Sequence, residues 1–353
     1  MNLLGTYLFW VVFAAVLFAV RRRTIVWPLA ALGLLLLYNN LFTPNFFHLE
    51  MIGGHLFGQR IDILNQGAKV MLLALGMTLV IATGGVDLSV GAVMAMAGSM
   101  AGLLMVNKGY SFGVSVGAAL GLSVLAGAWN GALVAYVGIQ PIIATLILMV
   151  AGRGVAQLIT DGQIINFTSP TMAYLGNGHF LGLPFTLTLV LLMLAVTFCL
   201  TRLTALGLFI ESVGDNPTAS RYSGVNARLV TFLAYVFTGF CAGLAGLVAS
   251  SNIKSADATH IGENLELDAI LAVVVGGTAL TGGRFYLVNS LVGALLIQTL
   301  ATTMYAKNIS PYVAPMPKAL VIIAVCLLQS AKVRRWLARF SPAQRAAAPL
   351  PQP

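Results

Sequence analysis

The sequence predicts an all-α membrane protein that crosses the bilayer about ten times. Hydrophobic residues make up 59% of the 353 residues and charged residues only 8%, and the mean hydropathy is +0.92. Soluble domains carry about 25% charged residues, so this chain has too few to cover a surface that faces water. The apolar runs are continuous over the length of a spanning helix, about 20 residues, whereas the strands of a membrane barrel would alternate with period two.

Apolar runs and the polar residues between them predict the individual elements. The ten expected spans are 27–42, 66–82, 88–106, 113–137, 142–160, 183–201, 229–250, 266–282, 287–305 and 317–331. An apolar stretch at 1–20 has its positive charges after it, the reverse of a secretory signal. We expect it to form an extra first helix, and a misassigned start or an interfacial helix are the alternatives. The chain then divides into this helix with a basic link (1–26), a membrane domain (27–331) and a basic cytoplasmic tail that we expect to be disordered (332–353).

The positive charges orient the chain. With Arg21–Arg23 in the cytoplasm, 12 of the 19 basic residues fall on the inner side and 5 on the outer side, while Lys69 and Arg153 fall within spans. This distribution follows the positive-inside rule and places the C-terminus inside. Lys69, near the outer end of its expected helix, is interpreted as reaching the membrane surface with its ammonium group.

One Gly-rich motif occurs twice. The segments "GGVDLSVG" at 84–91 and "GGTALTGG" at 276–283 share the pattern G-G-x-x-L-[S/T]-x-G, and each lies between apolar runs. Glycine tolerates positive φ, so the chain can unwind there at membrane depth, provided that the freed backbone groups find partners in the protein. Asp87 and Ser89 can supply them as caps of the next helix. Such paired segments point to broken helices beside a transport pathway, and a tight cytoplasmic turn with Asp87 as a simple N-cap is the alternative.

Polar side chains inside or beside the apolar runs are candidates for lining a translocation path. They are Asp87, Ser89, Asn130, Thr145, Arg153 and Gln298. A charge such as Arg153 within a span is expected to be paired, for example with Asp268, or to contact a hydroxyl-rich substrate. For the neutral side chains, hydrogen bonds between helices are the alternative. Glu266 and Asp268, at the outer mouth, either order their helix or meet a partner protein outside.

The longest cytoplasmic connection, 202–228, has the pattern of two short helices. The first has an apolar stripe on one face, formed by Leu206, Phe209, Ile210 and Val213. The second is expected after Gly214, with Asn216 as N-cap and Pro217 as its first residue. Gly224 is expected to end it. A plain surface helix is the alternative to a docking element.

The sequence gives no indication of a metal or nucleotide site. The three cysteines each lie alone in an apolar run and the four histidines are scattered, so we predict no metal site and no cofactor. There is no G-x-x-x-x-G-K-[ST] loop and no H-E-x-x-H, and no catalytic residue is predicted. The net charge of +9 follows the membrane orientation and does not indicate nucleic acid. An ABC permease, an ion-coupled secondary carrier and a membrane-embedded enzyme remain, and the few ionisable groups within spans disfavour the carrier.

Four blocks of the sequence resemble the sugar permeases of bacterial ABC importers of the ribose/xylose/arabinose/galactose group. They are "LGMTLVIATGGVDLSVGAVMAMAG" (75–98), "NGALVAYVGIQPIIATLILMVAGRGVA" (130–156), "VGDNPTASRYSGVN" (213–226) and "LELDAILAVVVGGTALTGGR" (265–284). Within the group, "RIDILNQGAKVMLLALGMTLVIATGG" and "TLILMVAGRGVAQLITDGQI" are most similar to the galactofuranose branch. The resemblance covers about residues 27–331, and the predicted N-terminal helix departs from it.

The resemblance implies a permease subunit with no ATPase of its own, in the bacterial inner membrane. It would import a monosaccharide together with a cytoplasmic ATP-binding protein, a periplasmic sugar-binding protein and a second permease subunit, identical or paralogous, all amid membrane lipid. The second helix of the 202–228 connection would then dock on the ATPase. Arg221 would face an acidic rim of that partner, and Glu211 would support the loop.

Overall fold

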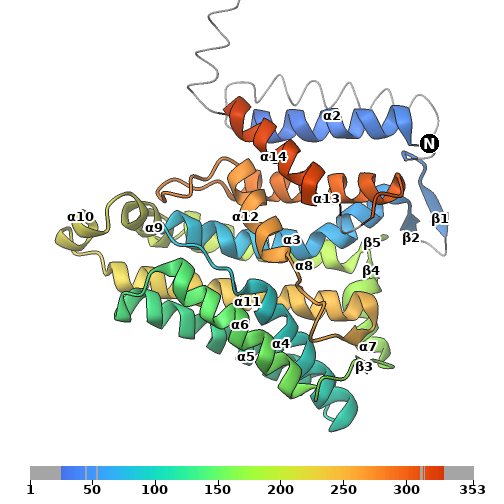
Figure 1. The fold of residues 1–353 in the computed structure, drawn as a ribbon, viewed down its shortest axis with the longest axis horizontal. Helices are drawn as coiled ribbons and strands as arrows, with labels where there is room; N and C mark the ends of the chain where they lie inside the picture. Colours follow the sequence, from blue (N-terminus) through green and yellow to red (C-terminus); the bar gives the residue numbers. More distant parts are fainter. Residues whose placement is uncertain (1–24, 44–45, 53–54, 311–312, 314, 330–353) are drawn as a thin grey trace, which may run out of the picture.

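The structure is a computed structural model that describes residues 25–43, 46–52, 55–310, 313 and 315–329. In these ranges the chain forms a bundle of helices, most of which lie roughly along one direction (Figure 1). Seven of the described helices are long and apolar enough to cross a membrane. The chain is therefore a polytopic α-helical membrane protein, as predicted.

Shorter helices lie in several of the connections between the seven long helices. The long helices are α3 (Gln59–Ala82), α4 (Val90–Gly102), α5 (Phe112–Ala132), α6 (Pro141–Ile159), α8 (Phe185–Arg202), α11 (Ala227–Ile253) and α13 (Leu287–Ala306). Two of them, α4 and α5, continue into π-helical turns at Leu103–Asn107 and Leu133–Val137. The shorter helices are α2 (Val26–Phe42), α7 (Pro170–Asn177), α9 (Leu206–Asp215), α10 (Pro217–Tyr222), α12 (Leu265–Val275) and α14 (Pro315–Gln329).

Three small antiparallel pairs of strands complete the described chain. They are β1 (Glu50–Ile52) with β2 (His55–Phe57), β3 (Ile165–Asn166) with β6 (Ser255–Ala256), and β4 (His179–Phe180) with β5 (Leu183–Pro184). The pair β3–β6 ties the connection after α6 to the end of α11, so it fixes two outer loops to each other.

Three of the ten expected spans correspond to shorter helices within the described residues. Helices α2, α12 and α14 have 17, 11 and 15 described residues, and α14 ends where the described chain ends. The expected span 266–282 is wrong beyond Val275, where Gly276 and Gly277 interrupt the helix, so α12 is only about 16 Å long. Helix α3 begins at Gln59 rather than at 66, and the first two turns that the prediction omitted are polar. The predicted extra helix and tail fall largely on 1–24 and 330–353, which lie outside the described residues.

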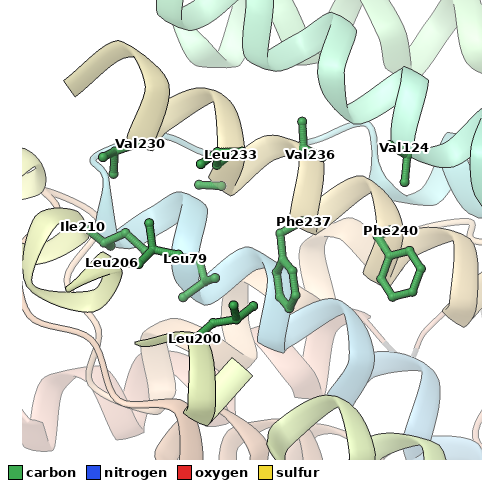
Figure 2. A pocket seen from close by; sticks show the side chains of 11 residues that line it. Leu79, Val124, Leu200, Leu206, Ile210, Val230, Leu233, Val236, Phe237 and Phe240 are labelled. Carbon is green, nitrogen blue, oxygen red and sulfur yellow. The ribbon is translucent and has the colours of Figure 1, made fainter. Parts of the chain in front are cut away.

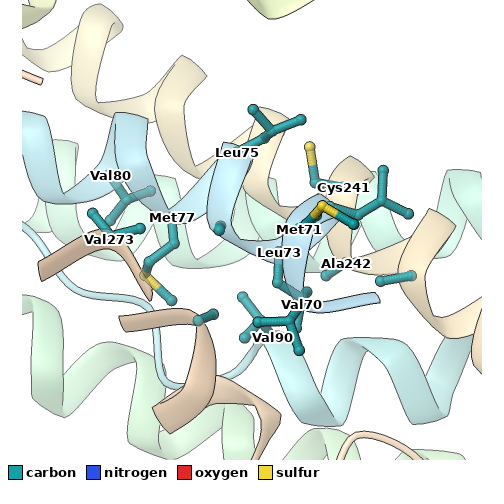
Figure 3. Packing of buried hydrophobic residues seen from close by; sticks show 14 of the residues in the cluster. Val70, Met71, Leu73, Leu75, Met77, Val80, Val90, Cys241, Ala242 and Val273 are labelled. Carbon is teal, nitrogen blue, oxygen red and sulfur yellow. The ribbon is translucent and has the colours of Figure 1, made fainter. Parts of the chain in front are cut away.

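Helix α3 is the core of the bundle. Every residue from Gly67 to Ala82 is buried except Lys69, which is half-buried, and the helix packs against α8, α11, α12 and α13. Figure 3 shows Met71, Leu75 and Met77 of α3 packed beside residues of α4, α11 and α12. A helix that is apolar on all sides is the kind that a bundle surrounds completely.

Glycines bring α5 and α11 into backbone contact. A Cβ on Gly127 would lie 2.5 Å from the Tyr235 carbonyl oxygen, and one on Gly239 would lie 2.5 Å from the Ser123 carbonyl oxygen. Both distances are far below van der Waals contact, so this approach requires glycine on both helices. Gly127 belongs to a run of α5 that is rich in small residues, from Gly117 to Ala132. Gly117 and Gly121 of the same run have no such neighbour.

The two ends of the bundle differ. Helices α9 and α10 lie at one end, and α7 with the strand pairs β1–β2 and β4–β5 lies at the opposite end (Figure 1). Arg202, Arg221 and Arg228 are all exposed at the end that carries α9 and α10. The positive-inside rule predicts that this end faces the cytoplasm, and we refer to it as the cytoplasmic end.

Candidate functional site

The first Gly-rich segment re-enters the bundle. Residues 83–89 are not helical, and α4 begins only at Val90. A Cβ on Gly85 would lie 2.6 Å from the hydroxyl oxygen of Tyr235, which is about 12 Å along α11 from its cytoplasmic end. Gly85 is buried, so unwound backbone lies between helices of the bundle, where its polar groups need partners from the protein.

Asp87 organises this segment. Its side chain is 2% exposed, and Oδ1 accepts hydrogen bonds from the Ser89 amide at 2.9 Å and the Ser89 hydroxyl at 2.6 Å. Asn130 of α5 donates from Nδ2 to the Ser89 hydroxyl at 2.8 Å and to Asp87 Oδ1 at 3.4 Å. The amide that Asp87 binds belongs to Ser89, the residue directly before α4. Ser89 was predicted to cap α4 as well, but its hydroxyl bonds to these side chains and makes no cap bond.

The Val86 carbonyl is the second point at which the segment is held. It accepts from the Tyr235 hydroxyl at 3.3 Å and from the Thr145 hydroxyl at 3.5 Å. The Thr145 hydroxyl also donates to the Pro141 carbonyl of its own helix at 2.9 Å. Tyr235 is fully buried and was not among the predicted residues, although a tyrosine inside an apolar run signals a hydroxyl that needs a partner.

Arg153 holds a second stretch of non-helical backbone. Its Nη1 donates to the carbonyls of Ala258 and Thr259 at 3.2 Å each and to that of Ile261 at 2.5 Å. The guanidinium thus satisfies carbonyls of the loop between β6 and α12. The suggested pair with Asp268 does not form, because Asp268 is bound to Lys318 instead.

The loop that Arg153 contacts is also stabilised by hydrogen bonds within the loop. Asp257 Oδ1 accepts from the amides of Thr259 and His260, and its Oδ2 lies 2.8 Å from His260 Nδ1. Burial raises the pKa of Asp257, but the hydrogen bonds from His260 and Thr259 outweigh it, so this pKa lies below its ordinary value. Further along, Gly262 has φ +77° and lies so close to Gly91 that a Cβ would be 2.3 Å from the Gly91 carbonyl oxygen.

The outer acidic residues are not displayed at the surface. Glu266 is 5% exposed and its carboxylate lies against Gly91 at the start of α4. Asp268 is half-buried and accepts from Lys318 Nζ at 2.8 and 3.0 Å. These positions favour the ordering role over contact with a partner protein. Gln298 lies apart from the Asp87 segment, on the outer half of α13.

Both copies of the Gly-rich motif meet at the cytoplasmic end, together with α9. The Gly283 amide donates to the Ala82 carbonyl at 2.9 Å. A Cβ on Gly214 of α9 would lie 1.8 Å from the Ala82 carbonyl oxygen and 2.4 Å from the Gly283 nitrogen. A Cβ on Gly282, where φ is +89°, would lie 2.9 Å from the Gly84 nitrogen. We call the contact of Gly84, Gly214, Gly282 and Gly283 the glycine junction.

Helix α9 is embedded in the bundle by its apolar face. Ile210 and Val213 are buried and Leu206 is half-buried, as the stripe predicts, but Phe209 is 37% exposed. Figure 2 shows Leu206 and Ile210 lining an apolar groove of about 370 Å³ with side chains of α3, α5, α8 and α11. The helix is therefore anchored to several transmembrane helices at once.

Helix α10 projects from the cytoplasmic end with both ends capped. Asn216 Oδ1 accepts from the amides of Thr218 and Ala219 at 3.1 and 3.0 Å, and Pro217 is the first helical residue, as predicted. At the other end Gly224 has φ +85°. The Gly224 amide donates to the Arg221 carbonyl, and the Val225 amide donates to the Ser220 carbonyl. This pair of hydrogen bonds is a Schellman motif. On α10, Arg221 is exposed and Tyr222 is 90% exposed, whereas Glu211 on α9 is half-buried.

Comparison with known proteins assigns this architecture to a family. A family described as "branched-chain amino acid transport system / permease component" matches residues 59–328. The chain belongs to this family of permease components. The match includes the Asp87 segment, the glycine junction, α9 and α10, and it confirms the family that the sequence blocks predict.

Several relatives of this permease are named as sugar permeases. The galactofuranose transporter permease protein of Escherichia coli is 51% identical over 314 residues, which cover 88% of this chain and 92% of that protein. The fructose import permease protein of Bifidobacterium longum is 38% identical, covering 87% and 88% of the two chains. The ribose import permease protein of E. coli is 36% identical, covering 86% and 93%. No solved structure matches the chain.

Proposed function

We propose that this permease is the membrane subunit of an ATP-driven importer of a monosaccharide, with galactofuranose as the first candidate. The observation that carries the proposal is the 51% identity to a galactofuranose permease over 88% of this chain. The family description names branched-chain amino acids, but the relatives just described import sugars. Residues 27–331 would form the permease domain in the bacterial inner membrane.

The proposed partner proteins follow from the missing nucleotide-binding loop and from the exposed helix α10. It has no nucleotide-binding loop, so ATP hydrolysis would belong to a separate cytoplasmic protein. Helix α10, exposed and capped at the cytoplasmic end, is the element that supports docking of that protein. A periplasmic binding protein would deliver the sugar, and a second permease subunit, identical or related, would complete the path.

The path itself would pass beside the unwound segments. Asp87, Ser89, Asn130 and Thr145 form or support one of them, and Arg153 holds the other. Because these side chains are occupied by hydrogen bonds to one another and to backbone, we assign them to shaping the path. Residues that line a cavity would then make the direct contacts with the sugar.

Uptake by cells tests this proposal. A strain without sugar uptake of its own would express the permease with the ATP-binding and sugar-binding proteins encoded beside it, and the control strain would lack only the permease. We expect radiolabelled galactofuranose to enter faster than ribose, fructose or galactopyranose, and leucine not to enter. Uptake of leucine, or of no sugar at all, would refute the proposal.

A further inference from the structure

A cavity of about 670 Å³ with a mixed polar and apolar lining opens in the outer half of the bundle, between α3, α12, α13 and α14. This size is within the range of about 300–1,000 Å³ typical of small-molecule sites. The side chains of Asp62, Gln66, Glu263 and Tyr305 are exposed at its rim. Lys69, Asp268, Gln298, Thr302 and Lys318 are half-buried inside it.

The sequence builds this cavity by close packing of α3 on α13. A Cβ on Gly67 would lie 3.2 Å from Cγ of Gln298, so the stem of Gln298 rests on α3 where glycine leaves room. The Gln298 amide donates to the Thr302 hydroxyl at 3.4 Å, and Lys69 Nζ donates to Gln66 Oε1 at 2.6 Å. Lys69 was predicted to reach the membrane surface, but α3 begins earlier than expected and places it against the cavity.

The charges of the cavity select the class of ligand. It holds three carboxylates and two ammonium groups, and the pair Asp268–Lys318 neutralises one of each. An anionic ligand such as a sugar phosphate would meet the carboxylates of Asp62 and Glu263. A neutral polyhydroxyl ligand can both donate to and accept from amide, hydroxyl, carboxylate and ammonium groups.

We infer that this outer cavity is the site at which the permease holds a neutral monosaccharide after its release from the binding protein. The inference rests on the proposed function and names its site. Gln298 and Thr302 supply neutral hydrogen bonds from α13, and Gln66 and Lys69 supply polar groups from α3. In this proposal Gln298 binds the sugar, whereas the Asp87 segment, whose polar groups bond to one another, shapes the path.

The test is sugar uptake and ATP hydrolysis in proteoliposomes that contain the complete transporter. Thr302→Trp fills the cavity, and Gln298→Leu removes an amide at nearly constant size. Val288→Trp and Gln157→Leu are the matched controls, since both positions are exposed on spans outside the cavity. ATP hydrolysis stimulated by the loaded binding protein is measured in the same samples.

We expect Thr302→Trp to lose uptake and to retain stimulated ATP hydrolysis. Gln298→Leu should take up about fivefold less sugar per ATP hydrolysed, the factor expected for one neutral hydrogen bond, and the controls should behave as wild type. If wild type transports and both cavity variants match it, the cavity is not the sugar site although the function stands. Loss of stimulated hydrolysis together with uptake in both variants would also overturn the inference, because the cavity would then serve assembly. A wild-type protein that transports no sugar would instead refute the proposed function.

Discussion

A single carboxylate organises the unwound segment between α3 and α4. Asp87 is buried, and no basic side chain in the described ranges forms an ion pair with it. Its Oδ1 accepts from the amide and hydroxyl of Ser89 and from Asn130. Because these three donors meet on one oxygen, we infer that Asp87 holds the turn.

Substitution of Asp87 tests this role. Asp87→Asn keeps an acceptor for the Ser89 amide and should retain partial transport. Asp87→Leu removes the acceptor and leaves buried donors unpaired, at about 1–3 kcal/mol, so it should insert into the membrane but lose most uptake. Uptake by reconstituted protein is the measurement, and full activity of both variants would contradict the account.

The glycine junction is the second feature that depends on single residues. At Gly214 the nearest atoms to an added Cβ are backbone atoms of Ala82 and Gly283, which cannot move without displacing both Gly-rich segments. We expect Gly214→Ala to lower stability by about 1–3 kcal/mol and to reduce ATP hydrolysis stimulated by sugar. Gly117→Ala is the control, because no atom lies within 4 Å of its Cβ position. If the thermal midpoints and stimulated hydrolysis of the two variants agree, the junction does not matter.

At residue scale, the sequence predicts local bonds better than distant ones. The Asp87 bond to Ser89 and the Asn216 cap span two or three residues and follow from side-chain chemistry alone. Arg153 reaches carbonyls more than a hundred residues away, and Tyr235 reaches Val86, 149 residues away. Those partners depend on how helices pack, which no local pattern encodes.

At the scale of elements, α9 and α10 form one unit with two different halves. Helix α9 is packed against α3, α8 and α11, while α10 has few contacts with the bundle and is exposed. An anchored helix joined through Asn216 to a projecting one is suited to transmit movement from a partner to the transmembrane helices. The sequence predicts this unit well, because caps, Pro217 and Gly224 are all local signals.

Replacement of residues 215–223 by a Gly/Ser chain of equal length tests that unit. The change removes α10 and leaves the buried face of α9 in place. We expect normal insertion and normal contact with the binding protein, but loss of sugar-stimulated ATP hydrolysis. Co-purification with the ATPase followed by a hydrolysis assay decides the matter. A variant that still binds its ATPase and transports normally would show that α10 is only a surface helix.

At the scale of the whole molecule, the class of polytopic α-helical membrane protein is predictable from the sequence, while the breaks within the spans are not. Ten spans are predicted, and seven described helices are long and apolar enough to cross a membrane. Helix α12 stops at Val275 and α3 starts at Gln59. Hydropathy averages over a window, so it joins α12 to the Gly-rich segment after it and omits the polar start of α3. The outer cavity could not be predicted, since it needs four helices to be placed together.

The central claim, that the permease works in an ATP-driven importer, is tested most directly by the energy source of uptake. Proteoliposomes would contain the permease with its ATPase partner. The sugar-loaded binding protein would be added on the membrane face opposite α10, and ATP on the face that carries α10. We predict sugar accumulation that requires ATP hydrolysis and persists when ionophores collapse proton and sodium gradients. Accumulation without ATP that those ionophores abolish would contradict the account and identify an ion-coupled carrier.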